Sequence, residues 1–205
     1  MADTPTTSPL GGHYERFAAL SDTARPCEEP YVTMVDLRVD PTDPDAHTAA
    51  QIVGLAALPT TPSTRATTGQ PGSEVTAIWR GPDEWLVTTT AMSGTDLETR
   101  LRAAMTGGAA VDVSAQHTTV RLSGRHARDV LAKGCAVDLH PRVVGTGAAI
   151  ATMLGQAAVV IVPLDDVGTD YRIIVRSSFA RYLGDWIVDA AAEFALPEPG
   201  VGAFR

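Results

Sequence analysis

Apolar and polar residues alternate in two pairs of short segments, and each pair is followed by a stretch with helical spacing. In the first block, strands are predicted at 75–79 and 84–89, joined by the turn signal Gly81-Pro82-Asp83. A helix is predicted at 95–105, where the apolar residues recur on one face before two glycines end the pattern. The block therefore has the order strand, turn, strand, helix.

The second block repeats this order near the end of the chain. Strands are predicted at 158–162 and 171–176, and a long helix at 177–194. We expect this helix to pack on a sheet, and we do not expect Trp186 to stack on a cofactor. The helix follows the i, i+3, i+4, i+7 rule through Phe179, Tyr182, Leu183, Trp186, Ile187, Ala190, Ala191 and Phe194.

A strand and a helix precede each block. These are predicted at 32–39 and 47–55 in the first half, and at 118–122 and 125–132 in the second. The complete pattern is βαββα, present twice. It predicts an α+β fold of two ferredoxin-like modules, in which helices cover sheets and the loops remain for binding.

The pattern also predicts how the chain is divided. We expect a partly flexible N-terminal arm at 1–28 and one pseudo-symmetric α+β domain at 29–195. Its modules would span about 29–113 and 114–195, and an irregular tail would follow at 196–205.

Breaker and capping residues refine these limits. Pro41–Asp45 should separate the first strand from its helix, and Ser123 is a candidate N-cap for the helix at 125–132. A further short strand is predicted at 110–113. Residues 59–73 are rich in Thr, Pro, Gly and Ser, and a loop of this length is either mobile or used for contact.

Charge and composition narrow the classes of partner. The net charge of −8 argues against nucleic acid and anionic membrane surfaces, which require clustered Lys and Arg. No apolar run reaches the length of a spanning helix, and the first 12 residues lack the features of a signal peptide. Because Cys27 and Cys135 lie far apart without a CxxC partner, we expect a cytosolic protein with free thiols.

Candidate catalytic residues are few. Cys135 follows the end of a predicted helix, where the dipole disfavours a thiolate, so a small buried residue is the favoured interpretation over a nucleophile. Asp138 and His140 could serve acid–base chemistry, but a loop anchored by a buried polar pair is favoured. His117 and His126 stand alone, without the spacing of a zinc site.

Other motifs are also more consistent with structural roles. Gly145-Thr146-Gly147 lacks the third glycine of a dinucleotide loop, since position 150 is isoleucine. Asp112 and Ser114 could touch a ligand at a strand end, but a capping or turn role is favoured. Two acidic pairs, Glu28-Glu29 and Asp165-Asp166, have no EF-hand spacing and are expected to be solvated.

Several strings together resemble the gamma subunit of heterotetrameric sarcosine oxidase. Their order and spacing cover nearly the whole chain, and the combination is more specific than any one string. The strings are Ser8-Pro9-Leu10, Gly81-Pro82-Asp83-Glu84-Trp85-Leu86-Val87, Val111-Asp112-Val113-Ser114, Leu122-Ser123-Gly124, Lys133-Gly134-Cys135, Asp138-Leu139-His140-Pro141-Arg142 and Arg176-Ser177-Ser178-Phe179-Ala180 with Tyr182, Leu183 and Trp186.

The resemblance implies a fold like the folate-binding domain of glycine-cleavage T-protein. It implies a complex with alpha, beta and delta subunits that demethylates sarcosine oxidatively to glycine and converts O2 to H2O2. With tetrahydrofolate, the one-carbon unit leaves as 5,10-methylenetetrahydrofolate. FAD, FMN, NAD and folate are implied for the large subunits and zinc for the smallest, with no cofactor on this chain.

The resemblance supplies no catalytic residue, so we expect a non-catalytic, assembly-forming subunit. Candidate subunit contacts, chosen for aromatic character or loop position, are Trp79, Trp85, Asp138, His140 and Arg142. The alternative is a free-standing T-protein-like folate-binding protein or aminomethyltransferase-type enzyme, for which Asp112 is the nearest candidate carboxylate. A weaker alternative is a thiol enzyme that uses Cys135.

Overall fold

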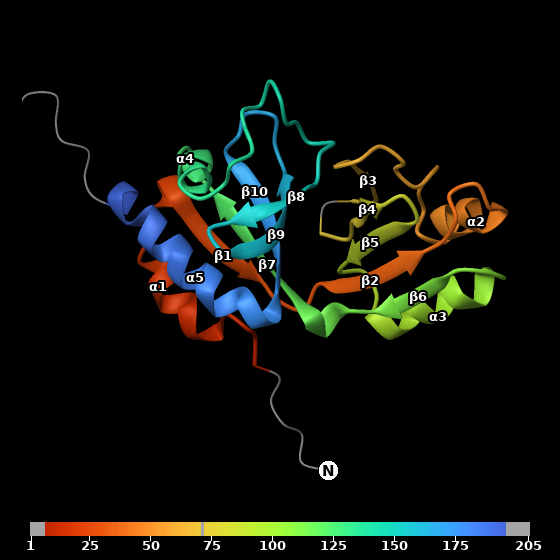
Figure 1. The fold of residues 1–205 in the computed structure, drawn as a ribbon. Coiled ribbons are helices and arrows are strands. Elements are labelled where there is room, and N and C mark those ends of the chain that lie inside the picture. Colours follow the sequence, from red (N-terminus) through yellow and green to blue (C-terminus); the bar gives the residue numbers. More distant parts are fainter. Residues whose placement is uncertain (1–6, 71, 196–205) are drawn as a thin grey trace, which may run out of the picture.

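The computed structural model describes residues 7–70 and 72–195, and in this part of the chain ten strands form two antiparallel five-stranded sheets (Figure 1). Each sheet carries its helices on one side, which confirms the predicted duplicated α+β fold. The predicted tail at 196–205 lies outside the described residues.

The first sheet contains the strands of the first predicted module. Its strand order is β3-β4-β5-β2-β6, and helices α2 (Pro44–Ile52) and α3 (Gly94–Ala104) pack on it. The hairpin β4–β5 turns where Gly81-Pro82-Asp83 predicted it, with Trp79 opposite Trp85. The strands are β2 (Thr33–Arg38), β3 (Arg65–Thr68), β4 (Val75–Gly81), β5 (Glu84–Thr89) and β6 (Ala109–Asp112).

The second sheet has the order β1-β7-β10-β9-β8. Helices α1 (Tyr14–Ala18), α4 (Ala127–Ala132) and α5 (Ser177–Ala191) lie on the same half of the molecule (Figure 1). The strands are β1 (Arg25–Glu29), β7 (His117–Ser123), β8 (Ile150–Leu154), β9 (Ala157–Pro163) and β10 (Asp170–Arg176). Short 3-10 turns lie at Gly11–His13, Asp22–Ala24, Ser114–Gln116 and Ala192–Ala195.

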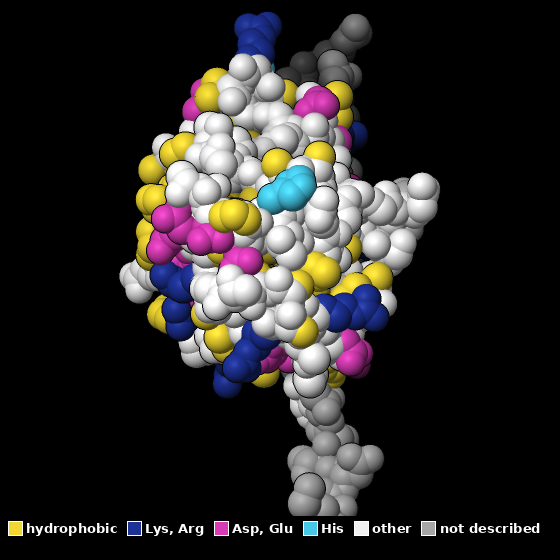
Figure 2. Space-filling model, turned by 90° about the vertical axis from the view of Figure 1, so that its right-hand side faces the viewer, with side chains coloured by type: hydrophobic (Ala, Val, Ile, Leu, Met, Phe, Trp, Pro, Cys, Tyr) yellow, Lys and Arg dark blue, Asp and Glu magenta, His cyan; other side chains and the backbone are white. Residues whose placement is uncertain are grey.

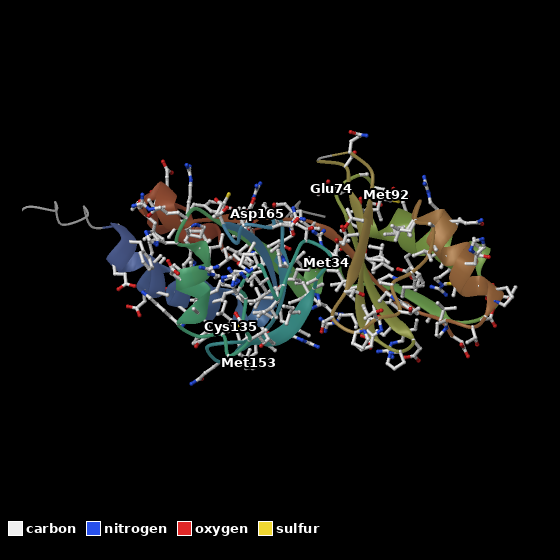
Figure 3. The ribbon with its side chains drawn as sticks, turned by 90° about the horizontal axis from the view of Figure 1, so that it is seen from above. Met34, Glu74, Met92, Cys135, Met153 and Asp165 are labelled. Carbon is white, nitrogen blue, oxygen red and sulfur yellow. The ribbon has the colours of Figure 1, made fainter. Side chains whose placement is uncertain are left out.

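The two sheets face each other through their helix-free sides. Side chains alternate along a strand, so Val35 and Leu37 of β2 join the core under α2 and α3, whereas Met34 points to the other sheet. Met34 lies at the junction of the two halves in Figure 3. The resulting order of layers is helices, sheet, sheet, helices. The apolar core between the sheets consists of Met34, Ile78, Leu86, Val113, Ala149, Val160, Val162 and Ile174.

Residues 7–28 of the predicted arm are built into the second half, which corrects the sequence-based boundary. Strand β1 pairs antiparallel with β7, so the segment that precedes the first module completes the sheet of the second. Leu10 and Phe17 are buried in the core of that half. The chain therefore passes through the second half before it builds the first.

The predicted loop at 59–73 contains the edge strand β3. Its beginning is joined to the second half by main-chain hydrogen bonds from Arg65 N to Gly147 O (2.9 Å) and from Ala149 N to Ser63 O (2.9 Å). This segment holds the two halves together at one end of the space between the sheets.

Two helix starts differ from the prediction. Helix α2 begins at Pro44 because the Asp43 side chain accepts a hydrogen bond from Asp45 N, and Pro44 suits the first turn. Helix α4 begins at Ala127 with His126 as N-cap, without a capping side chain. Ser123, the predicted cap, is the last residue of β7.

The buried face of α5 is rotated from the predicted stripe. Phe179 and Tyr182 are 44% and 37% exposed, whereas Ala180 and Gly184 are buried. Gly184 admits the N-terminal segment, because a Cβ at this position would lie 2.7 Å from the His13 ring. The packing of the N-terminal segment against Gly184 thus determines which face of α5 is covered.

The end of the molecule formed by α2 and α3 carries mixed charges. Figure 2 shows acidic and basic side chains interspersed there, with hydrophobic side chains in small separate groups. Among the described residues, no helix is long and apolar enough to cross a membrane.

Candidate functional site

A cavity of about 780 Å³ opens where the facing sides of the two sheets become polar. On the first sheet, Thr67, Thr76 and Thr88 lie side by side across β3, β4 and β5. The hydroxyls of Thr67 and Thr76 are 3.0 Å apart and hydrogen bonded. One row further along the strands, Ile78 and Leu86 belong to the apolar core between the sheets. The cavity therefore has hydroxyl groups on one wall and lies beside the apolar core between the sheets.

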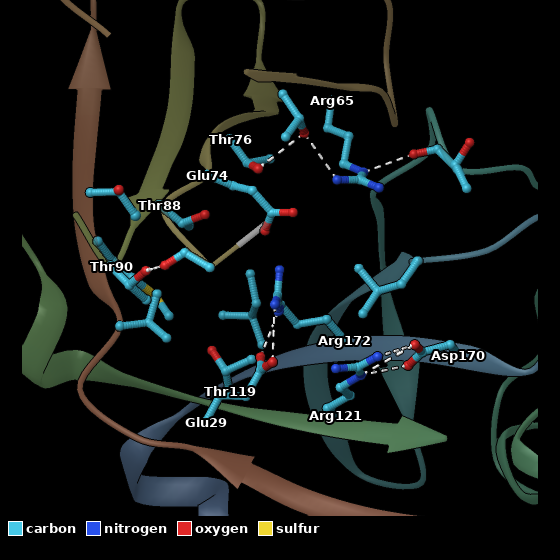
Figure 4. Close-up of a pocket in the computed structure, with 18 of the residues that line it drawn as sticks. Glu29, Arg65, Glu74, Thr76, Thr88, Thr90, Thr119, Arg121, Asp170 and Arg172 are labelled. Carbon is cyan, nitrogen blue, oxygen red and sulfur yellow. Dashed lines mark hydrogen bonds and ion pairs between the residues drawn. The ribbon is translucent and has the colours of Figure 1, made fainter. Parts of the chain in front are cut away.

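The opposite wall is built by β7 and β10 and is charged. Arg121 of β7 lies directly across from Arg172 of β10, and Thr119 lies across from Ile174. Two guanidinium groups side by side would repel, but each has a carboxylate partner. Asp170 accepts two hydrogen bonds from Arg121 Nε and Nη2, and Glu29 accepts from Arg172 Nε (2.5 Å) and Nη2 (3.0 Å) (Figure 4).

The Arg172–Glu29 ion pair stabilises the charged form of Arg172 on this wall. The hydrogen bond to Glu29 raises the pKa of Arg172, and this effect exceeds the opposing effect of burial. Both side chains are about one quarter exposed, so the pair is partly desolvated. It also joins β10 to the end of β1, which brings the N-terminal segment to the cavity.

Arg65 is the third guanidinium, and it reaches the cavity from the first half. Its Nε donates to Thr146 O (2.8 Å), Nη2 to Pro163 O (3.0 Å) and Nη1 to the Thr67 hydroxyl (3.0 Å). All three acceptors are neutral. Burial and the neighbouring Arg172 lower the pKa of Arg65, and Glu74 partly offsets them. Its positive charge is thus held in place without a carboxylate in contact.

Two further polar groups line the cavity wall. The hydroxyl of Thr119 is buried and has no hydrogen-bond partner among the described residues. Glu74 lines the cavity between the two halves and lies near Arg65 and Arg172 in Figure 4. The arrangement can bind a small polar molecule, because groups able to donate and accept hydrogen bonds converge on one partly enclosed space.

The ionisable groups that line the cavity are three arginines and the carboxylates Glu29, Glu74 and Asp170. Its described lining includes neither histidine nor cysteine, and two of its three arginines are bound to carboxylates. Among residues 7–70 and 72–195, no group of three or more His, Cys, Asp or Glu side chains is placed to hold a metal ion.

A comparison with family models matches residues 38–193 to the sarcosine oxidase gamma subunit family. The chain belongs to this family. The gamma subunit of sarcosine oxidase from Corynebacterium sp. strain U-96 is 33% identical over 178 residues, which cover 83% of this chain and 80% of that protein. The Arthrobacter gamma subunit is 38% identical over 128 residues, or 61% of each chain. This chain thus spans less than two thirds of the Arthrobacter relative.

Solved structures agree with the family assignment. One chain of heterotetrameric sarcosine oxidase from Corynebacterium sp. U-96, determined in complex with pyrrole 2-carboxylate, matches with a TM-score of 0.82 and 28% identity. The match covers 95% of this chain and 99% of that one. Aminomethyltransferase T of the Bartonella henselae glycine cleavage system matches with a TM-score of 0.59 and 12% identity, over 90% of this chain and half of that one. This second likeness confirms the T-protein-like fold.

The segment Asp138–Arg142 of this gamma-subunit family member is an exposed loop. The Asp138 carboxylate accepts a hydrogen bond from the backbone N–H of His140 (2.9 Å), and His140 Nδ1 accepts from the backbone N–H of Arg142 (3.1 Å). The side chains of Asp138, His140 and Arg142 are all exposed. The predicted buried polar pair is therefore wrong, because each ring or carboxylate bonds to the backbone on the surface.

The two predicted tryptophan contacts differ in exposure. Trp79 is half-buried against the core of the first half. Trp85 is fully buried, and its Nε1 donates to Pro59 O (2.7 Å). Trp85 offers no exposed atoms to a partner, so we assign it to the core rather than to a subunit contact.

The other candidate residues have structural roles. Cys135 is buried directly after α4, and both cysteines are free, as predicted. Asp112 accepts hydrogen bonds from the backbone N–H and the hydroxyl of Ser114, which confirms the turn role. The Thr146 N–H donates to the Asp166 carboxylate (2.8 Å), and strand β8 rather than a helix follows Gly145-Thr146-Gly147, so this segment does not open a dinucleotide-binding helix.

The acidic pair Glu28-Glu29 and two histidines complete the comparison with the sequence-based predictions. Glu28 is buried and Glu29 is paired with Arg172, so the prediction that this acidic pair is solvated is wrong. His126 contacts Asp129 (2.8 Å) and stacks on Phe194. Burial lowers the pKa of His117, which stands at the start of β7.

The cavity residues were not singled out from the sequence. Arg65 lies in the predicted loop, and Arg172, Thr119 and Thr76 belong to strands whose polar positions are typical of a solvent-facing side. The available signal was the alternation of polar residues along β4, β5, β7 and β10. This alternation indicates a cavity only if it is also known that the polar sides of the two sheets face each other.

Proposed function

We propose that this chain is the gamma subunit of a heterotetrameric sarcosine oxidase with alpha, beta and delta partners. In this proposal the complex oxidatively demethylates sarcosine to glycine, reduces O2 to H2O2, and forms 5,10-methylenetetrahydrofolate when tetrahydrofolate is present. The observation that carries the proposal is the structural match, with a TM-score of 0.82, to 99% of one chain of heterotetrameric sarcosine oxidase. The family match over residues 38–193 supports it.

The chain itself is proposed to be structural rather than catalytic. The candidate nucleophile Cys135 is buried, and the candidate carboxylate Asp112 is engaged by Ser114. FAD, FMN, NAD and zinc would then be carried by partner subunits, and the chemistry they supply would take place there. The purified chain is expected to bind neither flavin nor NAD, and a stoichiometric yellow cofactor on it would refute this part.

The loop Asp138–Arg142 and the half-buried Trp79 are proposed as partner contacts. The loop projects three exposed polar side chains, and the adjacent Val143 is 66% exposed. An exposed aliphatic side chain beside an arginine is a composition that suits the edge of a protein interface. Because hydrogen bonds from backbone N–H groups to the Asp138 and His140 side chains hold the loop, little conformational entropy would be lost on binding.

Co-expression with the large flavoprotein subunits from the same source tests the proposal. Native mass spectrometry should show one copy of this chain per complex, and the complex should oxidise sarcosine. The double substitution Arg142→Ala with Val143→Ser should weaken assembly by about tenfold or more. Arg100→Ala on the exposed side of α3 is the matched control. A stable lone chain that never joins the large subunits would overturn the assignment, and unchanged assembly of the double variant would overturn the contact.

A further inference from the structure

We propose that the cavity between the sheets binds a small monocarboxylate with an apolar body, whose carboxylate is held by Arg65. The first argument is how the three guanidinium groups of the cavity are paired. Arg172 is bound to Glu29 and Arg121 to Asp170, each through two hydrogen bonds. Arg65 forms no ion pair among the described residues, although Glu74 lines the same cavity and acts on it electrostatically. Its guanidinium is therefore the one that a ligand carboxylate can contact directly.

Arg65 is held ready for such a ligand. A guanidinium has five N–H donors, and three of those of Arg65 bond to neutral oxygens of both halves. The group is therefore fixed in orientation while donors on Nη1 and Nη2 remain. A carboxylate that meets them gains charge-assisted hydrogen bonds in a partly desolvated space, where such bonds are stronger than in water.

Thr119 supplies a second, independent observation. Its side chain is 1% exposed and lines the cavity, yet its hydroxyl has no hydrogen-bond partner in the described structure. A buried hydroxyl without a partner is unfavourable in the free protein. A ligand in the cavity could bond to it and remove this cost, which gives the site a built-in preference for an occupied state.

The other groups on the wall determine which anion is preferred. Glu29, Glu74 and Asp170 line the same cavity, so a doubly charged phosphate would meet more repulsion than a single carboxylate. Val32, Met34 and Ile174 form an apolar floor that suits an aliphatic or aromatic body. The volume of about 780 Å³ is within the range of small-molecule sites.

Titration of the full chain with benzoate tests the proposal, and benzamide, the neutral molecule of the same shape, is the control ligand. Binding is followed through the side-chain Nε–H NMR signal of Arg65 and through a dissociation constant from the titration. Benzoate should shift this signal saturably, and benzamide should not. Arg65→Gln should weaken benzoate binding by about 10- to 100-fold, the equivalent of a lost charge-assisted contact. Arg65→Lys should recover part of the affinity, and Arg100→Gln should bind as the wild type does.

Thr119→Val separates a binding role from a structural one. Because the hydroxyl has no partner in the free protein, its removal should leave the melting temperature unchanged or raise it, while benzoate binding weakens a few-fold. This variant and the ligand pair decide the question even if Arg65→Gln does not fold. The proposal is overturned if benzoate causes no saturable shift, if benzamide binds equally well, or if the Arg65 and Thr119 variants bind benzoate as the wild type does.

Discussion

Glu28 is predicted to fasten the N-terminal segment to the second half of the molecule. It is 5% exposed, and its carboxylate accepts hydrogen bonds from Thr118 Oγ1 (2.7 Å), from Leu10 N (3.3 Å) and from the Ser8 hydroxyl. Two of these donors belong to the N-terminal segment and one to β7. Glu28→Ala would remove this acceptor from all three, and Leu10 N would keep only its weak hydrogen bond to Ser8 Oγ (3.4 Å).

The size of the effect follows from these contacts. A buried donor left without a partner costs about 1 to 2 kcal/mol when hydroxyls can reorient, so three donors give a loss of about 3 to 6 kcal/mol in the free energy of unfolding. Glu28→Gln keeps one acceptor oxygen and should lose less. Glu15→Ala, at an exposed position of α1, is the matched control and should change stability by less than about 0.5 kcal/mol.

Urea unfolding followed by tryptophan fluorescence measures these differences, and hydrogen exchange locates them. The Leu10 amide should exchange faster in Glu28→Ala than in the wild type, since the shorter of its two hydrogen bonds is removed. If Glu28→Ala unfolds at the same urea concentration as Glu15→Ala, with an unchanged Leu10 amide, the N-terminal segment is held by its apolar contacts alone and the reasoning is wrong.

Three further outcomes are expected. Gly124→Ala should cost more than about 3 kcal/mol in urea unfolding, because φ is +119° and the new Cβ would lie 2.4 Å from the Thr23 carbonyl, whereas Gly12→Ala should be nearly neutral. Burial raises the pKa of Tyr171 from 10.0 to about 12, so its contribution is complete below pH 10, and about 3 kcal/mol should be lost as the pH rises to 12. Tyr171→Phe should abolish that loss in alkaline unfolding curves. In mass spectrometry, iodoacetamide should label exposed Cys27 before buried Cys135; equal rates would contradict the structural role of Cys135.

The sequence predicted the elements that follow simple apolar periodicity. Strand β5 has the predicted limits, and β4, β9, β10 and α3 differ by one or two residues. In these elements, whether a residue is buried depends on which side of its own strand or helix it occupies. A local sequence pattern is therefore sufficient to predict the element. The duplicated α+β fold could be derived from them, although each half has one more strand before its hairpin, β3 or β8, than the predicted βαββα order.

Elements whose burial depends on the other half were missed. Strand β1 has the sequence Arg-Pro-Cys-Glu-Glu. One of its buried residues is the polar Glu28, whose burial is possible because it accepts a hydrogen bond from a segment distant in the sequence. Strand β3 has the sequence Arg-Ala-Thr-Thr at a sheet edge, where alternation of apolar residues is not required. No window of the sequence contains the partner that makes either segment a strand.

The candidate site was missed for the same reason. Thr76, Thr88 and Thr119 are typical of a solvent-facing strand side, and only the facing of the two sheets encloses them. Trp85 shows the reverse case, because an aromatic residue beside a turn suggests a subunit contact, whereas this side chain fills the core. Surface and interior could not be separated from strand alternation alone.

The polar part of the space between the sheets argues for a role beyond holding the two halves together. The apolar rows of the same two sheets already join the halves, and partly buried ion pairs such as Arg172–Glu29 add little stability for the desolvation they require. If the space between the sheets served only stability, its apolar rows would be expected to extend along the whole sheet. The Thr119 hydroxyl would then not be left without a hydrogen-bond partner among the described residues. Replacing Arg172 and Glu29 together by Met and Leu should therefore leave stability unchanged or increase it. If the exchange instead unfolds the chain, the polar wall is structural, and the argument for a ligand rests on Arg65 and Thr119 alone.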